Sequence, residues 1–335
     1  MDSENSDHSS ESGEINGEWF KKLQKIKEND PNTTWLGAVN NDDDDMIEED
    51  MTDEDWKELG RNIANNTHLS NVDLGGNIND QIMSCLFQGL TRSSSMKDMQ
   101  LYKNRLSVAG VRSMVPFLQN ADNLTRLDLE DNNIRSEGFN DLFRALHSSP
   151  IETLLVRRCG IDSIGIDSEH IPKKLTTITF DGNNINSDGC IEIAKLLKGG
   201  NATLQLLCLE DNKIDDDGVK ILVDALKNNT SLTHMYLRRN DGISVEGVKL
   251  CLRLVNDVSS INATLHSNHT LRYISVNTMG ISSDRRIQSQ ILDAVQINRE
   301  FQYDLDSVGK EKIIQTQLNS SKRKEWTDIQ GVSSS

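Results

Sequence analysis

Three consecutive carboxylates, Asp215 to Asp217, stand before Gly218 in a pattern that could bind calcium. An EF-hand loop needs an acidic ligand at its first position and a glutamate at its twelfth. Those two positions hold Lys213 and Asp224 in this chain. Aspartates just before a glycine also suit the start of a helix, where a side chain caps free backbone N–H groups. The pattern therefore predicts a helix start and no metal site.

The other residue types that carry catalysis form no recognisable set. His147, His234, His266 and His269 do not have the spacing of a metal-binding motif such as His-Glu-x-x-His. The chain also contains no phosphate-binding Gly-x-x-x-x-Gly-Lys-Ser/Thr loop and no Gly-x-Ser-x-Gly nucleophile turn. We therefore expect a protein that is not an enzyme and needs no cofactor.

The three carboxylates belong to a unit, residues 204–226, that organises the chain. Leu207 and Leu209 alternate like the buried side of a short strand. Asn212 follows the strand, and a buried amide at that place would have to satisfy backbone groups. Residues 219–226 then carry apolar side chains at helical spacing. Each unit is thus predicted to be a strand, a turn and a helix.

One such unit cannot bury its own apolar surface, so successive units must stack. Neighbouring strands lie about 4.8 Å apart, whereas packed helices need about 8–10 Å. A stack with strands on one side and helices on the other must therefore bend. The predicted fold class is α/β, a horseshoe-shaped solenoid with a parallel concave sheet and convex helices.

The unit recurs along most of the chain. About eight regular units begin at Leu69, Met96, Leu124, Ile151, Leu175, Leu204, Leu232 and Leu271, and a degenerate N-terminal one begins at Thr33. The unit from Ile151 is short, so we expect a loop or a single turn at residues 164–167. Structural asparagines are predicted at Asn104, Asn132, Asn183, Asn212 and Asn240, and also at Asn77, while Cys159 and Met279 take that position in two units.

Acidic residues are concentrated near the N-terminus. Residues 1–55 carry 18 acidic and 4 basic side chains in a chain of net charge −16. We expect residues 1–30 to be an acidic arm, disordered over 1–14, with a short helix at 17–28 that covers the end of the solenoid. Residues 31–68 are expected to form an N-terminal cap with the degenerate repeat, in which Thr52 to Asp55 resembles a helix capping box. Residues 69–303 would then form the solenoid, and 304–335 a polar tail.

Composition limits the class of partner. The repeat region is nearly neutral, which argues against general nucleic-acid binding because that needs a basic surface. No apolar run approaches the roughly 20 residues that span a membrane, and the polar N-terminus does not resemble a signal peptide. Five cysteines without close spacing predict reduced, buried thiols. We expect a monomer in the cytoplasm, with the nucleus left open.

Eight units of Leu-x-x-Leu-x-Leu-x-x-Asn/Cys-x-Ile followed by a helix resemble leucine-rich repeat proteins. The length of about 28 residues and the helical second half are similar to the ribonuclease-inhibitor-like subclass. That subclass includes the repeat domains of NOD-like receptors and of the Ran GTPase-activating protein. The resemblance covers residues 31–300 and implies a horseshoe that binds another protein.

Two alternative functions follow from related resemblances. The first is regulation of a small GTPase of the Ran GTPase-activating type, although that family has its acidic region after the repeats and this chain has it before them. The second is capping of actin filaments, because Asn29-Asp-Pro31 and Asn65-Asn-Thr-His68-Leu look similar to the start of the tropomodulin repeat domain. Tropomodulin-like domains have fewer repeats than this chain.

The candidate binding surface is the concave face, on which we expect an unidentified partner protein to bind. Tyrosine and arginine anchor interfaces, and acids beside arginines discriminate between partners by charge. The two tyrosines and four arginines in this set are expected to carry most of the binding. The partner-binding candidates are Tyr102, Lys103, Glu130, Asp131, Arg157, Arg158, Glu210, Asp211, Tyr236, Arg238 and Arg239.

Overall fold

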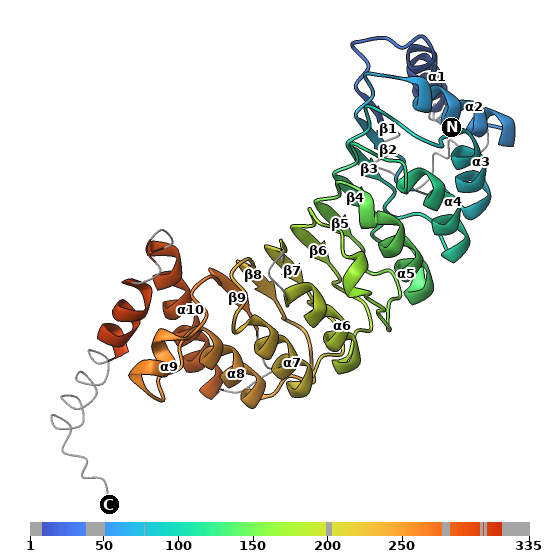
Figure 1. Cartoon of the computed structure of the whole chain (residues 1–335). Coiled ribbons are helices and arrows are strands. Elements are labelled where there is room, and N and C mark those ends of the chain that lie inside the picture. Colours follow the sequence, from blue (N-terminus) through green and yellow to red (C-terminus); the bar gives the residue numbers. More distant parts are fainter. Residues whose placement is uncertain are drawn as a thin grey trace, which may run out of the picture. The chain divides into compact units, whose positions relative to one another are not determined.

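The computed structural model describes residues 9–37, 51–76, 78–198, 203–276, 282–301, 304 and 307–316, with the side chains of 9–17 and 282–285 left out. The chain divides into two compact units, Met1–Asn183 and Asn184–Ser335, called unit 1 and unit 2. The helices and strands are labelled in Figure 1. Each unit consists of a layer of short parallel strands and a layer of helices. The expected disorder of residues 1–8, the acidic loop after residue 41, Asn77 and Met279 lie outside the described residues.

The described residues of unit 1 form six strands, which pair in parallel in chain order within the unit. The strands are β1 Trp35–Gly37, β2 Asn71–Asp73, β3 Asp98–Gln100, β4 Arg126–Asp128, β5 Thr153–Leu155 and β6 Thr177–Thr179. The helices are α1 Ser9–Lys27, α2 Asp53–Asn65, α3 Asp80–Gly89, α4 Val108–Leu118 and α5 Arg135–Ala145, with short 3₁₀ turns η2 Leu146–Ser148 and η3 Ser168–His170.

Unit 2 repeats the same alternation. Its strands β7 Leu206–Cys208, β8 His234–Tyr236 and β9 Tyr273–Ser275 pair in parallel in that order. Its helices are α6 Ser187–Leu197, α7 Asp216–Leu226, α8 Val245–Val255, α9 Ile261–Leu265 and α10 Ser282–Glu300, and residues 307–316 are also helical. The predicted α/β class, with parallel strands and a helical layer, is confirmed in both units.

Strand register places equivalent repeat positions side by side. Leu127 of β4, for example, pairs with Met99 of β3 and with Leu154 of β5. All three are buried with at most 1% of their surface exposed. Since each strand repeats this register, the inward side chains form continuous apolar rows, and the outward side chains form rows as well.

The predicted helix starts are confirmed. Asp215 is the N-cap of α7, and its side chain accepts a hydrogen bond from the N–H of Gly218 at 3.0 Å. Thr52 and Asp55 form the predicted capping box at the start of α2. The three carboxylates 215–217 are therefore a helix start, as their position before a glycine indicated.

Three segments refine the expectations. The unit from Ile151 has only the 3₁₀ turn η3 where others have a helix, which agrees with its short length. Helix α1 begins at Ser9, earlier than the predicted 17–28, so the disorder expected for residues 9–14 is wrong. Acidic residues such as Glu11 and Glu14 suit the first turns of a helix. Residues 307–316 pack as a helix on unit 2, with Val308 and Lys312 fully buried. The domain boundaries expected at 30/31, 68/69 and 303/304 stay a prediction.

Candidate protein-binding surface

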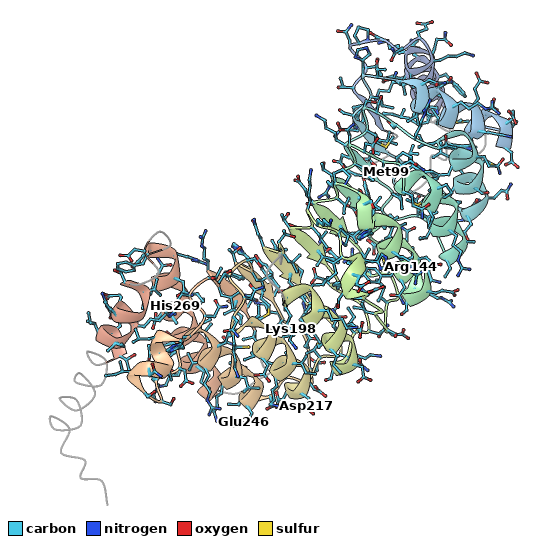
Figure 2. All side chains as sticks on the ribbon, viewed as in Figure 1. Met99, Arg144, Lys198, Asp217, Glu246 and His269 are labelled. Carbon is cyan, nitrogen blue, oxygen red and sulfur yellow. The ribbon has the colours of Figure 1, made fainter. Side chains whose placement is uncertain are left out.

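The side of each unit away from the helices carries the candidate residues. In β4, Leu127 and the following Leu129 are fully buried, whereas Arg126, Asp128 and Glu130 alternate to the other side. We call the outward strand positions, with the two turn residues after each strand, the strand-side face. Side chains such as Arg144, Asp217 and Glu246 belong instead to the helical layer (Figure 2).

The second turn residue after each strand from β2 to β8 has a left-handed backbone. Two of these seven residues are Gly76 and Gly182, with φ of +97° and +66°. The other five have φ between +49° and +56° and are predicted partner-binding residues, namely Lys103, Asp131, Arg158, Asp211 and Arg239. A non-glycine residue is strained there by about 1–2 kcal/mol. Long charged side chains at a position that favours glycine point to a role for those side chains.

The predicted asparagines hold consecutive repeats together, a repeat being one strand with its turn and helix. Asn240 Nδ2 donates to the carbonyl of Leu209 in the preceding repeat at 2.8 Å and to that of Leu237 at 3.0 Å. Its Oδ1 accepts from the N–H of Ile214 in the preceding repeat at 3.0 Å. We call this arrangement the asparagine clamp. Corresponding bonds are made by Asn104, Asn132, Asn183 and Asn212.

Cys159 replaces half of a clamp. Its thiol donates to the carbonyl of Leu129 in the preceding repeat at 3.1 Å, as an amide would. A thiol has no carbonyl oxygen that could accept a bond from the preceding repeat. In that repeat Ile134, the N-cap residue of α5, provides no side-chain cap hydrogen bond. Burial raises the pKa of Cys159 to about 12, so this donor stays protonated. None of the five cysteines forms a disulfide bond, and Cys208 alone among them is partly exposed.

A second row of asparagines, which the sequence analysis missed, precedes the strands. Asn229 Oδ1 accepts from the N–H of Leu232 at 2.8 Å, and its Nδ2 donates to the carbonyl of Leu197 at 2.9 Å. Asn66 and Asn268 make the corresponding bonds before Leu69 and Leu271. The sequence signal for this row is an asparagine three residues before the first leucine of a repeat, in the pattern Asn-x-x-Leu.

The strand-side face of unit 1 is a row of acids bridged by arginines. Arg126 lies between two aspartates, with Nε 3.6 Å from Asp98 Oδ1 on β3 and Nη2 3.2 Å from Asp128 Oδ2 on its own strand. Asp128 has only 6% of its surface exposed. The arginine therefore compensates carboxylates that the sheet partly buries.

Arg157 and Arg158 are also paired inside unit 1. Arg158 contacts Asp131 with two bonds, Nε to Oδ1 at 2.5 Å and Nη2 to Oδ2 at 2.7 Å. Arg157 Nε lies 3.1 Å from Glu130 Oε1, at an angle that makes it an ion pair and not a hydrogen bond. These four predicted partner-binding residues are thus brought together in two pairs between neighbouring turns.

The pKa values record the same environment. Burial raises the pKa of the carboxyls of Asp73, Asp98, Asp128 and Glu130 above the ordinary value. Nearby arginines offset this only in part for Asp98, Asp128 and Glu130, and the N–H of Gly75 does so for Asp73. The Arg158 guanidinium instead lowers the pKa of Asp131. Tyr102 is half-buried beside them, lying so close over Gly75 that an added Cβ would meet its ring at 2.8 Å. Its neighbour Lys103 is a left-handed turn residue.

The strand-side face of unit 2 is aromatic. Tyr236 and Tyr273 lie on neighbouring strands with ring centroids 4.9 Å apart, and His234 stacks on Tyr273 at 6.1 Å. We call these three residues the tyrosine patch. All three are half-buried, so each ring keeps an exposed surface. Burial, followed by the charges of Arg299 and Arg272, lowers the pKa of His234, and the imidazole is neutral at pH 7.

Four arginines stand at the two ends of the tyrosine patch. Arg238 and Arg239, the turn arginines, follow β8, and Arg238 Nη2 lies 3.5 Å from the hydroxyl of Tyr273. Arg272 and Arg299, the strand-start arginines, lie at the other end, with the Arg299 guanidinium 5.8 Å from the Tyr273 ring centroid. Of these four arginines, Arg239 alone has an ion pair at 4.0 Å or less with a described residue, its Nη2 lying 3.7 Å from Glu210 Oε2.

Sequence analysis named only part of this cluster. Tyr236, Arg238 and Arg239 were candidates, with Glu210 and Asp211 on the adjacent turn. Arg299 could not be found from the repeat, because it comes from α10 and reaches the sheet by donating to the carbonyl of Arg272 at 2.6 Å. His234 was weighed only as a metal ligand. Tyr273 was visible at the outward position of the last strand.

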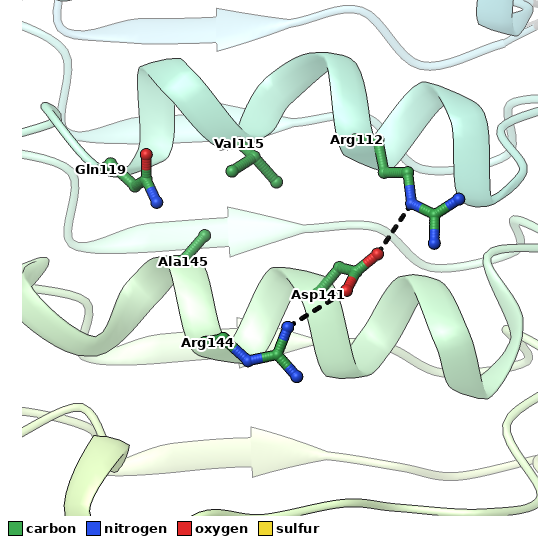
Figure 3. A pocket seen from close by; sticks show the side chains of 6 residues that line it. All are labelled: Arg112, Val115, Gln119, Asp141, Arg144 and Ala145. Atoms are coloured by element: carbon green, nitrogen blue, oxygen red, sulfur yellow. Dashed lines mark hydrogen bonds and ion pairs between the residues drawn. The ribbon is translucent and has the colours of Figure 1, made fainter.

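Two grooves elsewhere are weaker candidates. Between α4 and α5 a groove of about 270 Å³ contains Arg112, Asp141 and Arg144, whose charges pair with one another (Figure 3). Beside residues 307–316 a cleft of about 240 Å³ contains Lys312, whose Nζ donates to the carbonyl of Val255 at 2.5 Å. Burial lowers the pKa of Lys312 to about 7. Among the described residues, no group of three or more His, Cys, Asp or Glu could hold a metal ion.

Known proteins place the chain in a class. Residues 122–139, 200–223 and 228–250 match the Leucine Rich repeat family. With its asparagine clamps and its alternating strands and helices, this protein is a leucine-rich repeat protein. Among the helices that the structure describes, none is long and apolar enough to cross a membrane.

More particular similarities follow from curated proteins. Ribonuclease inhibitor from Sus scrofa is 26% identical over 171 residues, which cover 48% of this chain and 37% of that protein. NACHT, LRR and PYD domains-containing protein 14 from Homo sapiens is 27% identical over 159 residues, covering 45% of this chain and 14% of that protein. The protein thus resembles both repeat regions, and the match spans well under half the length of either relative.

Two solved structures are similar at low scores. The crystal structure of the Rad7 and Elc1 complex in yeast has a TM-score of 0.40 at 12% identity, covering 78% of this chain and 76% of that one. Leiomodin-1 actin-binding site 2 has a TM-score of 0.21 at 12% identity, covering 90% and 96%. At these scores neither structure supports an argument about function.

Proposed function

We propose that this protein is a non-enzymatic interaction module that binds a partner protein on its strand-side face. The observation that carries the proposal is the tyrosine patch, in which three half-exposed rings lie among four arginines. Tyrosine and arginine are the residues that most often dominate binding energy at protein interfaces. The similarity to ribonuclease inhibitor supports a binding role for the repeat fold in general.

The helical layer supports binding less well. Its charged side chains in α4 and α5 are occupied with each other, since Arg112 bonds both Glu137 and Asp141. Exposed ion pairs of this kind contribute little to stability and offer a partner no unpaired charge. We also propose that the protein is monomeric and cytoplasmic. None of its five cysteines forms a disulfide bond and four are buried, which suits a reducing compartment.

A capture experiment with matched variants tests the proposal. The wild-type protein is immobilised beside three double variants, Arg238→Glu with Arg239→Glu, Arg157→Glu with Arg158→Glu, and Lys198→Glu with Lys220→Glu. The last pair reverses two exposed cations on the helical layer of unit 2. Circular dichroism confirms folding, and captured proteins are quantified by mass spectrometry.

The expected result is a protein that is recovered by the wild type and the helical-layer variant and lost with a strand-side variant. Recovery that is unchanged in both strand-side variants, or lost equally with the helical-layer variant, would overturn the proposal. Loss with only one strand-side variant assigns the binding to that unit.

A further inference from the structure

The strand-side face of unit 2 has a specific pattern of charge. We propose that it binds an extended acidic segment of the partner, with carboxylates at the turn arginines and at the strand-start arginines and an apolar side chain on the tyrosine patch. This inference rests on the proposed function and names the chemistry of the partner.

The first support is the spacing of the two arginine pairs. Arg272 lies two repeat positions before the centre of its strand and Arg238 lies three after the centre of the neighbouring one. Strands rise about 3.3 Å per residue, so the backbones of Arg272 and Arg238 are about 16 Å apart along the strands. That distance corresponds to about five residues of an extended peptide lying parallel to the strands.

The second support is the position of Tyr273 between both ends. The Arg238 Nη2 lies 3.5 Å from its hydroxyl, and the Arg299 guanidinium lies 5.8 Å from its ring centroid. One half-exposed ring is thus bordered by cations that come from β8 and from α10. An apolar side chain on this ring would place its flanking backbone within reach of both arginine pairs.

The third support is the contrast with the arginines of unit 1. Arg157 and Arg158 already have carboxylate partners in neighbouring turns. Within the described residues, Arg238, Arg272 and Arg299 have no carboxylate within 4.0 Å, and Arg299 is held instead by a backbone carbonyl. Carboxylates supplied by a partner would complete these guanidinium groups in the way that unit 1 completes its own.

A protein segment fits better than a nucleic acid. Single-stranded nucleic acid also stacks on aromatic rings, but it needs a continuous basic groove for its backbone. Here the centre of the face is neutral, and the adjacent turn carries the acids Glu210 and Asp211. Those acids interrupt a basic path across the turns, whereas a short peptide along β8 and β9 needs no such path.

Fluorescence anisotropy with defined peptides tests the inference on the full chain. The probe is a fluorescein-labelled peptide Glu-Glu-Ala-Phe-Ala-Glu-Glu, whose acidic pairs match the 16 Å spacing of about five residues. Its controls replace every glutamate by glutamine or by lysine. Labelled oligothymidylate and a peptide of residues 42–50 of this chain are measured as competing ligands.

The acidic probe is expected to bind about tenfold more tightly than the glutamine control, and this preference should fall as salt rises. The Arg238→Glu and Arg239→Glu double variant should remove the preference, and Tyr273→Ala should weaken both peptides. Arg157→Glu with Arg158→Glu, in unit 1, is the matched control and should change nothing. Arg299→Gln replaces the double variant if that protein does not fold.

Equal binding of the acidic and glutamine peptides would overturn the inference, as would tighter binding of oligothymidylate. Binding of the 42–50 peptide more tightly than the probe would assign the same site to the chain's own acidic segment and overturn the assignment to a partner. If the peptides show no preference while a captured protein is still lost with a strand-side variant, the proposed function stands and only this inference fails.

Discussion

The strand-side faces of the two units differ although their scaffold is the same. In unit 1 the outward rows hold acids that the sheet partly buries, and Arg126, Arg157 and Arg158 pair with them. In unit 2 the corresponding rows hold aromatic rings, and the arginines stand at their ends. The difference teaches that arginine on a repeat surface is not by itself a binding signal. Its neighbours on the adjacent strands decide whether it is already occupied.

The largest expected effect tests whether the scaffold is shared. Asn132→Ala in unit 1 and Asn240→Ala in unit 2 should each lower the free energy of unfolding by about 1–3 kcal/mol, because each leaves buried backbone groups unpaired. Denaturant titration measures the two values, and Asn133→Ala, at an exposed position next to the first clamp, serves as the control. Costs that differed strongly between the two clamps would show that the units are not built alike.

A smaller effect separates the two kinds of arginine. Arg126→Ala should destabilise unit 1 by about 1–2 kcal/mol, because Asp98 and Asp128 lose the cation that compensates their burial. Arg238→Ala removes an exposed side chain and should stay within about 0.5 kcal/mol of the wild type. Hydrogen exchange with mass spectrometry reports each unit separately. Equal losses of protection would contradict the comparison.

The left-handed turns give a still smaller difference. Arg239→Gly relieves backbone strain, loses an exposed ion pair to Glu210 that contributes little, and should stabilise the protein by about 0.5–1 kcal/mol. Arg158→Gly relieves the same strain but loses both bonds to Asp131, so its net effect should be near zero. Thermal unfolding of the two variants decides the matter. A gain in stability from Arg158→Gly as large as that from Arg239→Gly would mean that the pair of Arg158 and Asp131 does not stabilise unit 1.

A further difference between the units is in pH dependence. In unit 1 the raised pKa values mean that the folded chain binds protons more tightly than the unfolded chain. Lowering the pH from neutral toward the carboxyl range therefore adds stability there, until Asp131 with its lowered pKa is protonated. In unit 2 the folded state holds the proton of Lys312 less tightly, so stability rises as pH increases from about 7 toward 10.5.

Local hydrogen exchange at pH 5.5, 7 and 9 measures these two trends. Lys312→Met is the matched control, because it keeps the apolar stem of the side chain and should abolish the alkaline trend in unit 2 alone. A shared trend in both units, or an alkaline trend that survives in Lys312→Met, would contradict the assignment of these groups.

Much of this scaffold could be predicted from the sequence. Period-2 leucines, the asparagine after each strand and the helix-spaced apolar residues each report a local environment, so Asn212 and Asp215 were placed correctly. The pairing of charges was not predictable in this way, because Arg158 and Asp131 are 27 residues apart and meet only through strand register. Arg299 and Lys312 lie outside the repeat and are brought to their places by packing of α10 and residues 307–316. Their roles needed coordinates.

The asparagine clamp has a direction. Asn240 reaches from its own turn to the carbonyl of Leu209 and the N–H of Ile214 in the preceding repeat. Asn104, Asn132 and Asn183 likewise bond a carbonyl and an N–H of the preceding repeat, and Asn212 bonds the N–H of Ile185. During synthesis, a ribosome releases those groups before it releases the asparagine that satisfies them. Each new repeat therefore completes the hydrogen bonds of the repeat made before it, so these bonds form in the order in which the chain is translated. A stalled ribosome leaves the most recently made repeat with unpaired backbone groups that chaperones or other chains can bind.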